Sequence, residues 1–402
     1  MNLADVQAKY QAFKELGLKL DMSRGKPAPE QLDLSLPLLG ALDGFKTADG
    51  TDTRNYGGTV AEARALFASL LEVPAGQVVV DGSASLSLMH DVLIYSVVYG
   101  QPGHAPWAGQ NPAFICPVPG YDRHFAICEA LGIRMINVPM LETGPDMDEV
   151  ERLVASDASI KGMWNVPKYS NPGGVVYSDE TVRRLAAMKT AAPDFILMWD
   201  DAYRFHHLTA ENIVNANVID ACAAAGNANR AWVFASTSKV TFAGAGLAAV
   251  ASSADNIAWW TKKSGIRSIG PDKVNQLRHV RFLQDRAGLE ALMVKHRDIL
   301  TPKFDAVLER FEAILGGIEG VSWTYPKGGY FIDLVTPNGF AKQTVELAKA
   351  AGITLTPAGA AFPYGKDPKD AHIRIAPSFP SLKEITQAAE GIALALRLAI
   401  GR

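Results

Sequence analysis

A single lysine lies among small and hydroxylated residues in the segment Phe234–Gly246, which reads FASTSKVTFAGAG. Most lysines are solvated surface residues. Lys239 has apolar and small neighbours, so we expect its amine to be partly desolvated and biased toward the neutral form. A neutral amine is a nucleophile, and the segment therefore predicts a reactive lysine.

Three further segments place polar groups just after predicted strands. Asp200 ends the apolar run FILMWD, where open α/β sheets carry ligand-binding groups. Asn171 opens an Asn-Pro-Gly-Gly turn, and the segment 82–85 (GSAS) joins a strand to a helix whose free N–H groups can hold a phosphate. Each signal alone is also typical of an ordinary turn. Together, Asn171, Asp200 and Lys239 follow three successive predicted strands.

These residues need a sheet to position them. Seven apolar runs predict strands, several of them apolar at consecutive positions, as in a mostly parallel sheet covered on both faces. They are Val78–Val80, Phe114–Cys116, Arg134–Val138, Gly162–Val166, Phe195–Trp199, Trp232–Ala235 and Leu247–Ala251. Amphipathic stretches such as 59–72, 121–131 and 179–191 alternate with them, and Thr59–Glu62 and Ser381–Glu384 have the form of capping boxes. The pattern predicts a doubly wound α/β layer.

The pattern changes after Pro271. A helical stretch over Lys273–Leu315 is expected to break or kink at Pro302. Predicted strands follow at 321–325 and 330–335, and predicted helices at 340–350 and 382–398. We therefore expect a large domain over residues 46–285 with a seven-stranded, mostly parallel sheet. A smaller α+β domain would comprise residues 1–45 and 286–402.

Charge and composition exclude several classes of protein. The 402 residues include 39 basic and 42 acidic side chains, a net charge of −3 without a basic block, so no nucleic-acid partner is expected. Cys116, Cys128 and Cys222 have neither zinc-site nor disulfide spacing, which indicates reduced thiols and a cytoplasmic protein. No apolar run predicts a membrane span, and the N-terminus lacks the layout of a signal peptide.

The order and spacing of these motifs resemble the fold-type-I, pyridoxal-phosphate-dependent aminotransferases of class I/II. In that family an Asn-Pro-x-Gly turn, an Asp-x-Ala-Tyr strand end and a Ser-x-Ser-Lys loop recur in this order. An arginine in a C-terminal strand completes the set and is matched here by Arg374 in HIRIA. The segments RGKP (24–27), PGYDRHF (119–125) and IGPDKVNQLRH (269–279) are similar to a bacterial aspartate aminotransferase subgroup related to the aminotransferase domain of MocR-type regulators.

The resemblance implies pyridoxal 5′-phosphate as the cofactor and three catalytic residues. Lys239 would bind the cofactor covalently and then act as the base at the substrate Cα. Asp200 would keep the pyridine nitrogen protonated, which makes the ring an electron sink. Tyr203 would hydrogen-bond the ring hydroxyl together with Asn171.

The resemblance also implies the remaining contacts. Tyr121 would stack on the ring, Arg374 would bind the substrate α-carboxylate with its bidentate fork, and Gly25 and Asn171 would lie near the substrate. The residues implied for the cofactor phosphate are Gly82, Ser83, Ser236 and Ser238, with Tyr56 reaching the phosphate of a neighbouring subunit. A homodimer with shared active sites is thus expected. Ser85 is a further predicted cofactor-binding residue.

One position departs from the family pattern. Many members carry an arginine eight residues after the lysine to bind the phosphate, whereas this chain has Leu247. We hypothesise that Lys273 or Arg267, from the same or the other subunit, supplies the missing charge.

The amino group would pass in a ping-pong cycle between aspartate or glutamate and 2-oxoglutarate or oxaloacetate. Candidates for binding the second carboxylate of such a substrate are Arg24, Arg123, Lys168 and Arg267.

Other interpretations stay open. MocR-type regulators use a similar domain as a non-catalytic sensor, although this chain begins directly with a predicted helix instead of a DNA-binding module. A lyase or a decarboxylase would use the same cofactor. The segment 244–249 (GAGLAA) matches a dinucleotide fingerprint but leads into a predicted strand, which disfavours a nicotinamide enzyme. His206 and His207 lack a third ligand, so we expect a structural pair and no metal site.

Overall fold

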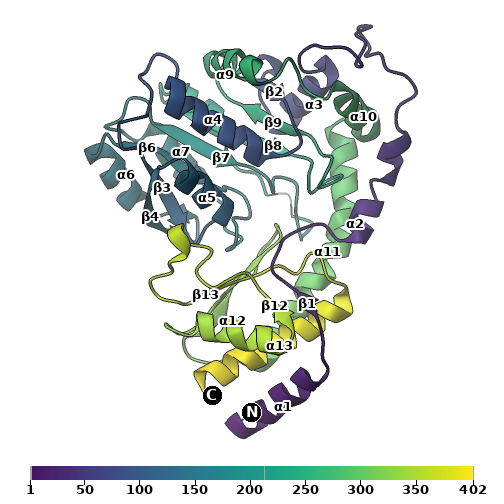
Figure 1. The fold of residues 1–402 in the computed structure, drawn as a ribbon, viewed down its shortest axis with the longest axis vertical. Helices are drawn as coiled ribbons and strands as arrows, with labels where there is room; N and C mark the ends of the chain where they lie inside the picture. The colour runs from purple at the N-terminus through teal and green to yellow at the C-terminus, as the bar shows by residue number, and fades with distance from the viewer. Residues whose placement is uncertain (1, 212, 402) are drawn as a thin grey trace.

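The computed structural model describes residues 2–211 and 213–401. A large sheet with helices on both faces forms the upper part in Figure 1, and two small sheets with α1, α12 and α13 form the lower part. The helix α11 runs from one part to the other, and both chain ends lie beside the lower part.

The α-helices of the described residues are α1 (Leu3–Glu15), α2 (Pro29–Asp33), α3 (Ala61–Leu71), α4 (Ser85–Tyr99), α5 (Asp122–Ala130), α6 (Met147–Ser156), α7 (Asp179–Ala187), α8 (Val218–Ala224), α9 (Ala254–Arg267), α10 (Lys273–Leu283), α11 (Arg286–Leu315), α12 (Ala341–Ala350) and α13 (Leu382–Ile400). Short 3₁₀ turns lie at Leu36–Gly40, Ala75–Gln77 and Pro363–Gly365.

The strands are β1 (Leu20–Asp21), β2 (Val78–Val80), β3 (Ala113–Val118), β4 (Arg134–Leu141), β5 (Gly144–Pro145), β6 (Ile160–Asn165), β7 (Ile196–Asp200), β8 (Ala231–Ser236), β9 (Ala248–Ala251), β10 (Ser322–Trp323), β11 (Ile332–Val335), β12 (Ile353–Thr354) and β13 (His372–Ile375). The large sheet has the order β2-β9-β8-β7-β6-β3-β4-β5. The small sheets are β10-β11-β13 and the parallel pair β1-β12.

All seven strands predicted for the large sheet are present, and the sheet is mostly parallel, as expected. The run from β8 through β7, β6 and β3 to β4 is parallel, whereas β9 is antiparallel to both of its neighbours. The sheet has eight strands instead of seven because β5 pairs antiparallel with the end of β4. Two residues, Gly144 and Pro145, carry no strand-like pattern, so the sequence could not predict β5.

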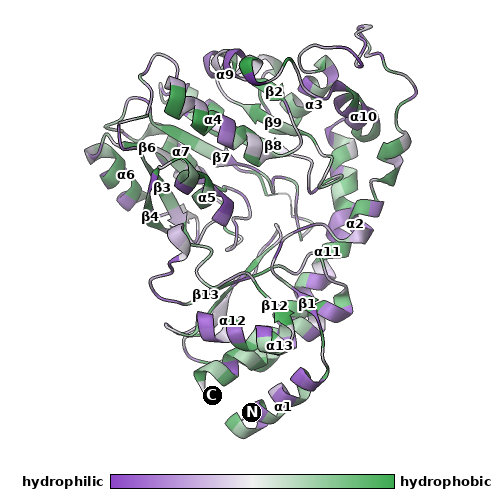
Figure 2. Cartoon of the chain, viewed as in Figure 1, coloured by the Kyte–Doolittle hydropathy of each residue, from purple (hydrophilic) through white to green (hydrophobic). Residues whose placement is uncertain are grey.

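Both faces of the large sheet are buried, which explains its consecutive apolar residues. In β7, Leu197 and Trp199 pack with α3, α6, α7 and α8, whereas Ile196 and Met198 pack with α4, α5 and α9. The central strand β7 is correspondingly hydrophobic in Figure 2, and α6 and α12 alternate polar and apolar residues. None of the helices in the two described ranges is long and apolar enough to cross a bilayer.

The lower part has its own hydrophobic core. Val6 and Phe13 of α1 pack there with Phe311 of α11 and with the apolar face of α13, so the N-terminal helix belongs with the C-terminal elements. The residue boundaries expected between the large and the small domain stay a prediction.

Two local predictions are wrong, namely one helical stretch over Lys273–Leu315 with a break at Pro302 and a capping box at Thr59. The helical stretch is interrupted at Gln284, which has a φ of +63°, and Pro302 lies inside the continuous helix α11. Pro302 has no N–H group to donate to the carbonyl oxygen of Asp298, one turn earlier. Both residues are exposed, so water can hydrogen-bond to that carbonyl oxygen. Thr59 does not cap α3, because its hydroxyl donates to the Val80 carbonyl oxygen at 2.9 Å. The capping box at Ser381 is confirmed.

Replacing Gly162 with alanine is expected to lower the free energy of unfolding by about 1–3 kcal/mol. A Cβ atom at Gly162 in β6 would lie 2.4 Å from Cζ of the buried Phe114 on the adjacent β3, where the ring has no room to move. Urea denaturation measures the change. The matched control is Gly76→Ala, because a Cβ atom there meets no atom within 4 Å. Equal stabilities of the two variants would contradict the prediction.

Candidate active site

The predicted polar residues meet at one edge of the large sheet. Asp200 is the last residue of β7, Lys239 follows β8, and Asn171 follows β6 after a short loop. Because these strands are parallel, their carboxyl ends share one edge of the sheet, as in other open α/β folds. A small pocket at this edge is lined by Ala84, Ser85, Leu86, Tyr121, Val166, Asn171, Asp200, Ala202, Tyr203, Ser238 and Lys239.

A second cavity of about 420 Å³ adjoins this pocket on the side of the lower part. Tyr121, Asn171, Tyr203 and Lys239 line both spaces. The further lining residues of the second cavity are Ser23, Arg24, Gly25, Lys26, Asp122, Arg123, Phe331, Thr354, Leu355, Thr356, Pro357 and Arg374. Gly25 and Arg374 thus line the second cavity, Asp200 lines the small pocket, and Lys239 lines both.

Asp200 is a buried carboxylate with one oxygen satisfied. His124 of α5 donates from Nε2 to Oδ2 of Asp200 at 2.9 Å, and the His124 ring stacks on Trp164 with 4.1 Å between the centroids. Oδ1 of Asp200 is buried and has no hydrogen-bond partner in the described residues. His124 was not among the residues predicted for the site, although it lies in the segment PGYDRHF, three residues after Tyr121.

Burial sets the protonation of the groups around this carboxylate. It lowers the pKa of the Lys239 amine, and the negative charge of Asp200 opposes that shift only in part. It raises the pKa of the Tyr203 hydroxyl well above its ordinary value and that of Tyr121 to about 12. Nζ of Lys239 lies 5.1 Å from the centroid of the Tyr203 ring. The site therefore combines an amine with a reduced proton affinity and two phenols that keep their protons.

Arg374 is held at the other end by residues that the sequence analysis did not assign. Its Nη1 donates to Oδ1 of Asp122 at 2.7 Å and to Asn171 at 3.4 Å, and its Nη2 donates to Thr356 at 3.2 Å. The guanidinium is buried, and its Nε has no partner among the described groups. Asp122 adjoins Tyr121 in the sequence, but only the pairing of β13 with the small sheet brings Arg374 to it.

Small and hydroxylated residues lie around the start of α4 and the end of β8. Of these, Ser85 and Ser238 line the small pocket, whereas Gly82, Ser83 and Ser236 do not. Ser85 is the first residue of α4, Gly82 before it has a φ of +68° that favours glycine, and Ser83 is exposed between them. The hydroxyl groups of Ser236 and Ser238 lie 2.8 Å apart.

Leu247, Arg267 and Lys273 have different surroundings. The side chain of Leu247 is buried in the core of the large sheet. Arg267 pairs with Asp81 at 2.6 Å and with Asp91 at 3.1 Å. Lys273 is buried and donates to the carbonyl oxygens of Tyr56 and Asp52, without a carboxylate partner in the described residues.

Tyr56 does not line the pocket of its own chain. Its side chain is 78% exposed, and Ile266 and Ile269 are exposed to a similar extent, 74% and 72%. A Cβ atom at Gly270 would lie 1.9 Å from the carbonyl oxygen of Gly57, so the turns that carry Tyr56 and Ile269 are in contact. These residues form an exposed apolar patch.

The four candidates for binding the second carboxylate of the substrate lie in different places. Arg24 and Arg123 line the cavity that contains Arg374, and their side chains form no hydrogen bond or ion pair with the described residues. Arg267 lines neither of the two spaces and already has two carboxylate partners.

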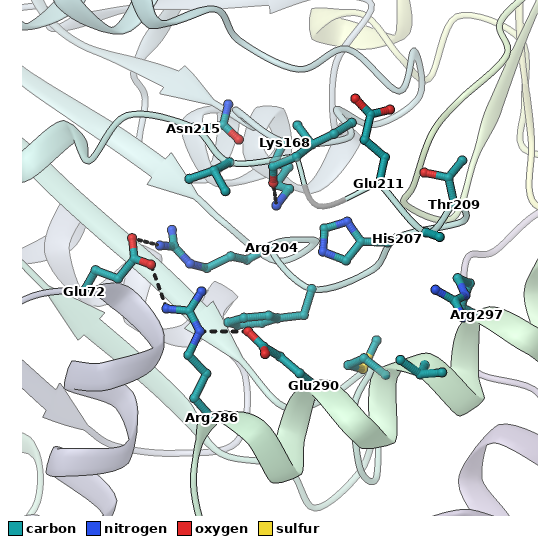
Figure 3. A pocket seen from close by; sticks show the side chains of 16 residues that line it. Glu72, Lys168, Arg204, His207, Thr209, Glu211, Asn215, Arg286, Glu290 and Arg297 are labelled. Atoms are coloured by element: carbon teal, nitrogen blue, oxygen red, sulfur yellow. Dashed lines mark hydrogen bonds and ion pairs between the residues drawn. The ribbon is translucent and has the colours of Figure 1, made fainter.

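Lys168 lies in a separate pocket, shown in Figure 3. Its amine donates to the Ile213 carbonyl oxygen, and burial lowers its pKa to about 8. Arg204 and Arg286 both bind Glu72 in this pocket. Since the pocket shares no lining residue with the two spaces above, the structure places Lys168 away from Arg374.

Comparison with known proteins agrees with this arrangement. The sequence profile of the aspartate amino-transferase family matches residues 2–402. The chain is 48% identical over 402 residues to the aspartate aminotransferase of Corynebacterium glutamicum, covering 98% of this chain and 93% of that protein.

Solved structures show the same fold. The crystal structure of an aspartate transaminase from Corynebacterium glutamicum is similar with a TM-score of 0.97 at 47% identity, covering 99% of this chain and 95% of that one. The α-aminoadipate aminotransferase LysN of Thermus thermophilus, complexed with N-(5′-phosphopyridoxyl)-L-leucine, has a TM-score of 0.78 at 20% identity, covering 98% and 97%. This chain belongs to the aspartate aminotransferase family and is a pyridoxal-phosphate-dependent aminotransferase of fold type I.

Proposed function

We propose that this aminotransferase moves the amino group between aspartate or glutamate and 2-oxoglutarate or oxaloacetate in a ping-pong cycle. The observation that carries the proposal is the buried Asp200 with one free oxygen at one end of the site and Arg374 at the other. Lys239 lines both the small pocket of Asp200 and the adjoining cavity of Arg374. A molecule that spans them is held at both ends while its centre faces an amine.

The residues present fit pyridoxal phosphate. The free Oδ1 of Asp200 can accept the N–H of a protonated pyridine, which removes an unsatisfied acceptor from the buried site. Tyr121, Asn171 and Tyr203 surround the same pocket and would hold the ring. When bound, the cofactor supplies an electron sink for the negative charge that develops at the substrate Cα.

The phosphate would lie against the small residues at the start of α4 and after β8. The free N–H groups of that helix start and the hydroxyls of Ser83, Ser85, Ser236 and Ser238 suit a dianion. Of the two proposed cations, Arg267 is already neutralised by two carboxylates, whereas Lys273 has no carboxylate partner in the described residues. Neither lines the pocket of its own chain, so a contact of either with the phosphate stays a proposal.

The remaining roles in binding the substrate and transferring the proton would fall to side chains around Lys239 and Arg374. Arg374 would bind the substrate α-carboxylate through a bidentate pair, with Asn171 beside it. Because burial lowers the pKa of Lys239, its amine could take the proton from the substrate Cα and deliver it to C4′ of the bound cofactor, and the reverse half-reaction would run this transfer backwards. Tyr203, which keeps its proton, would donate a hydrogen bond to the ring hydroxyl oxygen. His124 would keep Asp200 oriented.

The preference for a dicarboxylate is supported by Arg24 and Arg123. Both line the cavity of Arg374 without a carboxylate partner among the described residues, so either can bind the second carboxylate of the substrate.

A homodimer with shared sites is supported by the exposed apolar patch around Tyr56. Exposed apolar clusters are typical of interaction surfaces. Lys273 donates to the Tyr56 carbonyl oxygen and would hold this turn in place for a second subunit.

A single half-reaction with aspartate tests the proposed aminotransferase function. Adding aspartate to the loaded enzyme, without a 2-oxo acid, is expected to convert the aldehyde form of the cofactor to its amine form and to release oxaloacetate. Absorbance spectroscopy and product analysis follow both changes. A sensor would bind aspartate without conversion, and a lyase or a decarboxylase would release a different product.

The variant Lys239→Ala is expected to bind cofactor but to convert it at least about 100-fold more slowly, because the base is lost. A wild-type rate in this variant would exclude Lys239 as the base.

The lowered pKa of Lys239 predicts a pH-dependent stability in the apoprotein. Between the folded-state pKa and the unfolded value of about 10.4, the unfolded chain binds one more proton, so wild-type stability rises with pH in this window. The variant Lys239→Met has no such group. It is expected to be more stable than wild type at pH 7, with a difference that shrinks toward pH ~10.4 by about 1.4 kcal/mol per unit of lowered pKa. Urea denaturation across this range measures it, and a constant difference would contradict the prediction.

Replacing Arg24 or Arg123 with alanine tests the second carboxylate site. For the arginine that binds it, kcat/KM for aspartate is expected to fall about 10- to 100-fold, since a charged hydrogen bond is lost. The value for alanine as donor should change by no more than about twofold. Arg183→Ala is the control, because Arg183 pairs with Glu180 on the exposed face of α7. If neither variant alters the preference for aspartate over alanine, both arginines are excluded.

A further inference from the structure

A buried polar network lies behind the backbone of Lys239. Its central residue is Gln31 of α2, whose Nε2 lies 3.0 Å from Nδ1 of His296 on α11 and 3.0 Å from the hydroxyl of Tyr330 before β11. The Ala28 amide donates to Oε1 of Gln31 at 3.0 Å. Gln31, His296 and Tyr330 are buried, and they come from three segments far apart in the sequence.

The network ends on two adjacent carbonyl groups of the lysine loop. His296 donates from Nε2 to the Val240 carbonyl oxygen at 3.0 Å, and the Tyr330 hydroxyl donates to the Lys239 carbonyl oxygen at 3.4 Å. Nε2 of His206 lies 3.4 Å from the same Lys239 oxygen. The backbone on the C-terminal side of the reactive lysine is therefore held by side chains from outside its own loop.

One arrangement of protons satisfies the network without a charge. Gln31 uses its two amide hydrogens on His296 Nδ1 and on the Tyr330 oxygen, which leaves the tyrosine proton for Lys239 and the His296 Nε2 proton for Val240. Burial lowers the pKa of His296 to about 4 and raises the pKa of Tyr330, so both side chains stay neutral near pH 7. No cation of the network repels the amine of Lys239.

A network of this kind makes the lysine backbone rigid. Buried polar groups that are fully hydrogen-bonded favour one geometry, because breaking any bond leaves a buried group unsatisfied. A catalytic side chain must be held within about 0.5 Å of its productive position by such supporting contacts. The Tyr330 ring also packs against the Tyr203 ring, with 6.0 Å between the centroids, so the same residue supports two sides of the pocket.

We propose that Tyr330, His296 and Gln31 are positioning residues that fix the Lys239 backbone and thereby aim its ε-amine toward the bound cofactor. This proposal rests on the role of Lys239 in the proposed function. It assigns to α2 and α11 a part in the reaction, although neither helix contributes a side chain to the two spaces of the site.

The test compares Tyr330→Phe with Tyr10→Phe. Tyr10 is the matched control, because its buried side chain also donates from the hydroxyl to a backbone carbonyl oxygen, that of Leu347 at 2.9 Å. Both variants are expected to lose thermal stability. Only Tyr330→Phe should weaken cofactor binding to the apoprotein and lower kcat, each about 3- to 10-fold, the effect of one lost hydrogen bond. The KM for aspartate should stay unchanged, and the pH midpoint of the absorbance change of the loaded enzyme should shift.

A second pair of variants keeps the proposal testable through His296. His296→Gln retains an N–H that can reach the Val240 oxygen and is expected to keep most of the wild-type cofactor affinity, whereas His296→Leu is expected to lose about tenfold. If His296→Leu does not fold, the Tyr330 pair decides alone. The proposal is overturned if Tyr330→Phe matches Tyr10→Phe in cofactor affinity, kcat and pH midpoint.

Failure of this proposal is distinguishable from failure of the proposed function. Borohydride reduction of the loaded wild-type enzyme should leave the cofactor on Lys239, as peptide mass analysis would show. Absence of that adduct would reject the role of Lys239 itself. An adduct together with wild-type behaviour of Tyr330→Phe would reject only the positioning role.

Discussion

The buried carboxylate of Asp200 is the constraint on which the rest of the site depends. An ionised carboxylate away from water is costly unless its oxygens are hydrogen-bonded, and here His124 satisfies only one of them. His124 can do so because its ring is stacked on Trp164 and is itself buried. The second oxygen keeps its capacity for a cationic or N–H donor. The large sheet, the helix α5 and the stacked ring pair thus leave one strong buried acceptor without a partner in the described residues.

The two ends of the site carry opposite charges and differ in how they are compensated. Asp200 lies at the carboxyl end of a strand buried on both faces, where little can move. Arg374 belongs to the small sheet and is partly neutralised by Asp122, which lies on α5 beside His124. The short helix α5 therefore carries both His124, which binds Asp200, and Asp122, which binds Arg374. A ligand carboxylate at Arg374 would compete with or share the contact with Asp122.

Lys239 is influenced by both parts of the molecule. Its position along the chain follows from β8, but its backbone carbonyl accepts hydrogen bonds from His206 and Tyr330. The same burial that lowers the pKa of its amine also keeps His206 and His296 neutral. His206 thus lies next to the site with its Nε2 on the Lys239 carbonyl oxygen and its Nδ1 without a partner in the described residues. The helices α2 and α11 thus join the lower part to the chemistry at the sheet edge.

The sequence by itself determined seven of the eight strands of the large sheet, their mostly parallel arrangement and the place of Asn171, Asp200 and Lys239 after three successive strands. These features follow from local patterns: consecutive apolar residues, and polar residues directly after them. Only the tertiary structure decided the partners of these residues. The pairs His124–Asp200 and Asp122–Arg374 are 76 and 252 residues apart, and the link from Gln31 to Tyr330 spans 299. Such contacts depend on how sheets and helices pack, and a local pattern contains no record of that packing. For the same reason the sequence could not distinguish Arg24 and Arg123 from Lys168 and Arg267. The structure shows that the first two line the cavity of Arg374 and that the other two lie outside it.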